Sequence, residues 1–214
     1  MATLEMWPMR WPEARRSMII RRAILVCCLV VLMAMPGARA EPLADGAGEF
    51  ISSLAGKAIA ALTEEGISRD QKVARFRELL NDNFAVRSIG RWVLGRYWRK
   101  ATYAERSEFL TLFENLIVIT YVNRFEKYSG ETLTVTKTAV KKAGDVIVFT
   151  QISRSEGVKP INVDWRVRTD KGEYKIVDVI VEGISMGQTQ RSEFASVIRQ
   201  TGGKVKGLIE KLQK

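Results

Sequence analysis

Histidine is absent from the 214 residues of this chain, and cysteine occurs only twice. Without histidine the chain lacks the commonest general base and metal ligand, and it cannot build a Ser-His or Cys-His nucleophile. The remaining composition, 46% apolar and 27% charged, is typical of one globular domain. We therefore expect a binding protein rather than an enzyme, with no metal ion and no cofactor.

Both cysteines lie in the apolar run Ala23–Met35 near the N-terminus. Arginines precede this run and Ala38-Arg39-Ala40 follows it, an arrangement typical of a cleaved signal peptide. A membrane anchor is one alternative, but it would need roughly 18–20 apolar residues, more than this run provides. Export by a twin-arginine route is a second alternative. We expect residues 1–40 to be removed and residues 41–214 to form one exported domain without disulfides or reactive thiols.

The chain is basic, with 34 lysines and arginines against 24 aspartates and glutamates and a formal net charge of +10. An exported basic protein is attracted to anionic membrane surfaces or to acidic partner proteins. Nucleic acid is not expected as a partner, because export takes the chain out of the cytoplasm.

Helical periodicity dominates the first half of the exported segment. After an expected linker at 41–48, apolar residues recur at helical spacing over 50–62. Ser68 is placed as the N-cap of a second helix, and a shorter helix is predicted over 84–94.

Thr102 and Glu105 form a capping-box pattern that opens the longest predicted helix, which runs to about Ser129–Gly130. Apolar residues cover more than half of its circumference, so this helix must be buried on most sides or line a cavity. From residue 131 the period changes to 2, which is typical of strands. The pattern predicts four strands, at 131–140, 146–152, 161–168 and 174–181, and two closing helices, at 189–200 and 204–212.

Short connections between consecutive strands favour an antiparallel meander. The second and fourth strands are apolar on both faces, so other elements must cover each side. We predict an α+β fold: a curved antiparallel four-stranded sheet, wrapped by helices from the N- and C-terminal ends and enclosing an apolar cavity.

Two residue pairs could support catalysis, and both have a simpler explanation. Asp178 and Glu182 are four residues apart on one strand and could form a paired-carboxylate site. Carboxylates at the end of a sheet that pair with neighbouring groups are far commoner. Ser185 with Lys175 could form a Ser-Lys pair, but nothing around Ser185 is typical of a nucleophile turn.

The segment Arg91–Lys100 is the densest mixture of aromatic and basic residues in the chain. Its rings and guanidinium groups could border a lipid site, with the arginines reaching phosphate groups. Alternatively, the aromatic residues complete a core corner and the arginines are solvated.

Four segments occur in an order found in one protein family: Val93–Arg99 (VLGRYWR), Val163–Arg166 (VDWR), Asp178–Ser185 (DVIVEGIS) and Gln190–Phe194 (QRSEF). On these residues the chain resembles the MlaC family of periplasmic phospholipid-shuttle proteins, also called toluene-tolerance auxiliary proteins, from about Phe50 to Leu212. The resemblance implies a periplasmic carrier that moves phospholipid between an outer-membrane lipoprotein complex and an inner-membrane ABC transporter. A hopanoid-associated branch is similar over the last hundred residues.

On this resemblance we place the lipid tails among apolar residues chosen by face and position, each of which could equally be ordinary core. The predicted cavity residues are Leu94, Leu112, Phe113, Leu116, Val148, Trp165, Val167, Ile176 and Val179. Arg96 and Arg99 are predicted to border the mouth, near the head group. A monomer suits a diffusing shuttle. Two alternatives remain: a small-molecule enzyme on the same fold, and a cargo-free adaptor of the transporter.

Overall fold

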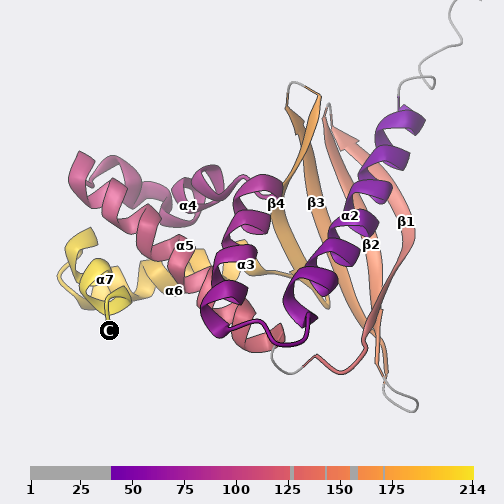
Figure 1. Cartoon of the computed structure of the whole chain (residues 1–214). Helices are drawn as coiled ribbons and strands as arrows, with labels where there is room; N and C mark the ends of the chain where they lie inside the picture. Colours follow the sequence, from indigo (N-terminus) through magenta and orange to yellow (C-terminus); the bar gives the residue numbers. More distant parts are fainter. Residues whose placement is uncertain (1–39, 126–127, 143, 155–158, 171) are drawn as a thin grey trace, which may run out of the picture. The chain divides into compact units, whose positions relative to one another are not determined.

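The computed structural model describes residues 40–125, 128–142, 144–154, 159–170 and 172–214 (Figure 1). Nearly all of the expected signal peptide and the predicted turn at 155–157 lie outside the described residues. The first half of the described chain is helical: α2 (Ala40–Thr63), α3 (Arg69–Asn83), α4 (Val86–Leu94), the 3-10 helix η1 (Gly95–Arg99) and α5 (Tyr103–Phe125). Five strands and two helices follow: β1 (Thr132–Lys142), β2 (Asp145–Ser153), β3 (Ile161–Asp170), β4 (Glu173–Val181), β5 (Ile184–Ser185), α6 (Met186–Gln200) and α7 (Val205–Leu212).

The linker predicted at 41–48 is wrong, because these residues form the first turns of α2. Two glycines in this segment allow α2 to approach the sheet closely. A Cβ at Gly46 would lie 2.4 Å from the Tyr174 hydroxyl, and one at Gly48 would lie 3.3 Å from Thr138 Cγ2. Packing against the sheet therefore outweighs the low helix propensity of glycine.

Both predicted N-caps are confirmed. At Ser68, the hydroxyl accepts a hydrogen bond from the Gln71 amide, and the Gln71 side chain accepts one from the Ser68 amide at 2.7 Å. At Thr102, the amide donates to Glu105 Oε2 at 2.8 Å and the hydroxyl accepts from the Glu105 amide at 3.2 Å. Each box satisfies two amide groups that a helix start leaves without a partner.

Replacing Thr102 with alanine is expected to lower the free energy of unfolding by about 1 kcal/mol, because the Glu105 amide loses its acceptor. Urea denaturation measures the change. Thr120→Ala is the matched control, since Thr120 is an exposed residue in the middle of α5, where alanine is the better helix former. Equal destabilisation by both substitutions would contradict a capping role for Thr102.

The sheet is an antiparallel meander in the order β1-β2-β3-β4-β5, which confirms the predicted topology. The predicted count of four strands is wrong by one. After β4 the chain reverses through Glu182 and Gly183, both with positive φ, and Ile184 and Ser185 pair back onto Val181 and Ile180. A strand of two residues is too short to show a period of 2 in the sequence.

Two apolar clusters form the core. The helical cluster joins α3 to α7 and includes Leu94, Phe109, Phe113, Phe194 and Leu208. The sheet cluster lies between α2 and one face of the sheet and includes Ala47, Ile51, Val146, Val148 and Val167. Figure 1 shows α2 running across β1 and β2, and helices α3, α4 and α6 contact β4.

No helix within the described ranges is both long enough and apolar enough to span a membrane.

Candidate functional site

The nine apolar residues predicted to line a cavity divide between the two clusters. In the helical cluster, Leu94 and Phe113 are buried, and Leu112 and Leu116 are partly buried. In the sheet cluster, Val148, Val167 and Ile176 are buried, and Trp165 and Val179 are partly buried. The lipid contacts predicted from face and position therefore do not form one continuous set.

The two clusters meet at the junction between α3 and α4, which lies against β4. Phe84, in this junction, packs against both clusters and forms an isolated parallel bridge with Ile176. The Ala85 amide donates to the Ile176 carbonyl at 2.9 Å, and Lys175 Nζ donates to the Asp82 carbonyl. We call this line of contact the seam. At the seam, both α3 and α4 contact β4.

The enclosed cavity predicted from the sequence is not confirmed. None of the nine apolar residues lines either of the two hollows described below. Val148, Val167 and Ile176 are fully buried among their neighbours, because apolar side chains pack to high density and voids forfeit dispersion contacts.

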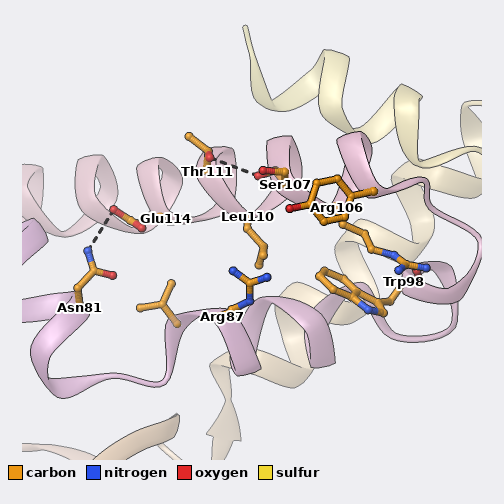
Figure 2. Close-up of a pocket in the computed structure, with 10 residues that line it drawn as sticks. Asn81, Arg87, Trp98, Arg106, Ser107, Leu110, Thr111 and Glu114 are labelled. Atoms are coloured by element: carbon orange, nitrogen blue, oxygen red, sulfur yellow. Dashed lines mark hydrogen bonds between the residues drawn. The ribbon is translucent and has the colours of Figure 1, made fainter.

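The first hollow, of about 370 Å³, lies between α5 and the segment from the end of α3 to η1. Figure 2 shows Arg87 and Leu110 pointing toward each other across it. At one end, Arg106 Nε donates to the Trp98 carbonyl at 2.8 Å. At the other, Glu114 accepts from Asn81 at 3.3 Å and also pairs with Arg77 at 2.6 Å. Much of this polar lining is thus satisfied within the protein.

The second hollow, of about 510 Å³, lies between α4, η1 and α6. Its walls contain four arginines and two tryptophans: Arg91, Arg96, Arg99, Arg191, Trp92 and Trp98. The structure thus brings Arg96 and Arg99, the predicted head-group residues, into one hollow. Sequence reasoning missed Arg191, which comes from α6. Only its place in the QRSEF segment could have drawn attention to it.

The carboxylates considered as a catalytic pair have structural roles. Asp178, only 7% exposed, accepts hydrogen bonds from the Val179 amide (2.9 Å), the Ser185 hydroxyl (2.7 Å) and the Gly187 amide (3.2 Å). Glu182 accepts from the Asn162 amide at 2.6 Å. Asp178 therefore fixes the turn from β4 into α6, and Glu182 joins that turn to β3.

The Ser-Lys pair is also accounted for by structural contacts. The Ser185 hydroxyl donates to Asp178 and accepts from the Gln188 amide at 3.0 Å as the N-cap of α6. Lys175 instead reaches the seam. Among the residues described, no three Asp, Glu, Cys or His side chains lie close enough together to hold a metal ion.

This chain is similar to one family profile and to two curated proteins. The profile of the family described as MlaC protein matches residues 52–214. The intermembrane phospholipid transport system binding protein MlaC of Haemophilus influenzae is 27% identical over 129 residues, 58% of each chain. The toluene tolerance protein ttg2D of Pseudomonas putida is 27% identical over 116 residues, 54% of this chain and 53% of that protein. The aligned region thus spans little more than half of these curated relatives.

A solved structure shares the fold. It is the phospholipid-binding protein from Ralstonia solanacearum in complex with a phospholipid, which matches with a TM-score of 0.68 at 20% identity, over 78% of this chain and 94% of that one. At this identity the match concerns the α+β fold, whereas the family profile covers most of the sequence. The chain belongs to the MlaC family.

Proposed function

We propose that this protein is a periplasmic phospholipid carrier that holds acyl chains between its helical and sheet clusters. It moves the lipid between an outer-membrane lipoprotein complex and an inner-membrane ABC transporter. The observation that carries the proposal is the seam, where the two apolar clusters meet at Phe84, which packs against both of them and forms a bridge with Ile176. Further support comes from the relatives, one described as a transport-system binding protein and one as bound to a phospholipid.

The energetics of lipid transport favour an interior site. Two acyl chains of about sixteen carbons each represent roughly 25 kcal/mol of transfer from water, at about 0.8 kcal/mol per CH₂. An open surface patch cannot shield that much apolar area. A bilayer offers the tails a similar apolar environment, so exchange between membrane and carrier is close to balanced. The carrier lowers the cost of crossing water.

The clusters must part for the tails to enter between them. Parting at the seam breaks the Ala85–Ile176 hydrogen bond and the Lys175 contact. Because both can be replaced by water, the main cost is the apolar contact around Phe84, which the acyl chains replace. The tails then contact the partly buried residues first: Leu112, Leu116, Trp165 and Val179.

The remaining predicted cavity residues lie deeper, and Arg96 and Arg99 lie at the surface of η1. In this arrangement the tails point toward Leu94, Phe113, Val148, Val167 and Ile176, and the head group stays near solvent. The proposed transport involves no chemical reaction between a protein side chain and the lipid.

Val179→Trp tests the tail site. Val179 pairs with Trp165 across β3 and β4, so a second indole there would occupy space proposed for the tails. Transfer of a fluorescent phospholipid between separated donor and acceptor vesicles is expected to fall about tenfold, with about 1–3 kcal/mol of destabilisation.

Val140→Trp is the matched control, because Val140 is exposed on β1 and should leave transfer unchanged. Unchanged transfer by Val179→Trp would argue against tails at the sheet cluster. No transfer by the wild-type protein, together with no extractable lipid, would favour the adaptor alternative.

A further inference from the structure

The second hollow concentrates positive charge on the face formed by α4, η1 and α6. Arg91 comes from α4, Arg96 and Arg99 from η1, and Arg191 from α6. No carboxylate lines this hollow. Within the described part of the chain, none of the four arginines forms an ion pair with an Asp or Glu. Four guanidinium groups without a counter-charge repel one another, so an anionic partner would stabilise this arrangement.

Aromatic rings and a glycine hold these arginines in place. The Arg191 guanidinium lies 5.4 Å from the centre of the Trp92 ring, and Nη1 donates to the Trp92 carbonyl at 3.2 Å. A Cβ at Gly95, whose φ is +57°, would lie 3.1 Å from Arg191 Cζ. Arg91 lies 5.9 Å from the centre of the Trp98 ring. Stacking on indoles reduces the entropy that these side chains lose on binding a ligand.

Basic residues around Tyr97 add to the positive potential of the hollow. Arg96 donates to the Tyr97 hydroxyl at 3.2 Å and lies 5.1 Å from the centre of its ring. This hydrogen bond, with Arg199 nearby, lowers the pKa of the Tyr97 phenol. The carboxylate of Asp178 lies at the Gly187 side of Trp92, where it already accepts hydrogen bonds from the Ser185 hydroxyl and the Gly187 amide.

The composition of the hollow favours a phosphate group at a membrane surface. Guanidinium groups bind phosphate oxygens in a bidentate manner, and several can share one phosphate. Trp92, 40% exposed, stands beside the arginines. Tryptophan is enriched where proteins meet the interface between lipid and water. A soluble anion would also be attracted by the four arginines, but it would gain little from contact with an exposed indole at the edge of the hollow.

We propose that the hollow lined by Arg91, Arg96, Arg99 and Arg191 binds the phosphate group of an anionic phospholipid within a bilayer surface, and that this face of the protein contacts the membrane. The inference adds a membrane-contact site to the carrier proposed above. It does not depend on where the tails of the transported lipid lie. The face would orient the carrier at a bilayer before or after exchange.

Vesicle co-sedimentation of the exported protein tests the proposal. The wild type should bind vesicles of phosphatidylcholine and phosphatidylglycerol in equal parts, and not vesicles of phosphatidylcholine alone. The double variant Arg91→Gln with Arg191→Gln should bind the anionic vesicles about thirtyfold more weakly, because two basic contacts at the surface are lost. Lys57→Gln with Lys141→Gln, which removes two exposed charges on α2 and β1, should change binding less than about threefold.

Four outcomes would overturn the proposal. Equal weakening by both double variants would indicate a general charge effect. A wild type that binds inorganic phosphate but not anionic vesicles would show a site for free phosphate, and one that binds neither would leave an acidic protein surface as the occupant. Normal vesicle binding by Arg91→Gln with Arg191→Gln, together with a loss of co-purified lipid, would place these arginines at the head group of the transported lipid. Lipid content is measured separately, so failure of the carrier function would be distinguishable.

Discussion

Replacing Phe109 with alanine is expected to lower the free energy of unfolding by about 3–5 kcal/mol. Phe109 is 0% exposed. Its ring centre lies 5.8 Å from that of Phe113 in a stacked arrangement and 5.8 Å from that of Phe194 edge-on. These three rings join α5 to α6, so the substitution removes both buried apolar area and aromatic contacts. The cavity left between two helices can collapse only in part.

Tyr103→Ala is the control for this substitution. Tyr103 is also an aromatic residue of α5, but it is 84% exposed, so its loss should change stability by no more than about 0.5 kcal/mol. Chemical denaturation followed by circular dichroism measures both variants. A Phe109→Ala protein that unfolds at the same denaturant concentration as the wild type would show that the contacts among Phe109, Phe113 and Phe194 do not stabilise the packing of α5 against α6.

A disulfide across the seam is expected to reduce lipid uptake at least tenfold. Phe84 and Ile176 are backbone bridge partners, and paired strands lie about 4.8 Å apart, within the range that a disulfide spans. Residues 41–214 contain no cysteine, so Phe84→Cys with Ile176→Cys can form only this bond within residues 41–214. If tails enter where the clusters part, the oxidised protein stays closed and the reduced protein loads.

The reduced form of the same double variant is the matched control, because it carries the same substitutions. Uptake from vesicles containing labelled phospholipid is measured before and after reduction, with circular dichroism to verify that both forms are folded. Equal uptake in the two redox states, with the disulfide verified by mass spectrometry, would show that tails do not enter at this seam.

Local patterns predicted most of the secondary structure. Capping residues at Ser68 and Thr102 mark two helix starts. Alternation of apolar and polar residues marks the first and third long strands, and runs that are apolar on both faces mark the second and fourth. The linker at 41–48 was mispredicted because Gly46 and Gly48 have a packing role that depends on Tyr174 and Thr138, far away in the sequence. Local propensity cannot report a contact over that separation.

The candidate sites depended even more on tertiary structure. Periodicity placed the predicted cavity residues Leu94 and Phe113 on apolar helical faces, and both are buried in the helical cluster, but periodicity cannot tell which of two cores a residue joins. The second hollow combines the Arg91–Arg99 segment with Arg191 from α6. Composition drew attention to the first segment. Only the packing of α4 against α6 adds the fourth arginine, Arg191, which stacks on Trp92 of that segment.

The most direct test of the proposed carrier function is native mass spectrometry of the protein purified from the periplasmic fraction of its cells, followed by solvent extraction and lipid analysis. We expect a stoichiometric mass increment that resolves to phospholipid. A hopanoid in the extract would instead assign the protein to the hopanoid-associated branch. A mass equal to that of the polypeptide alone, with no uptake from vesicles of labelled phospholipid, would contradict the account.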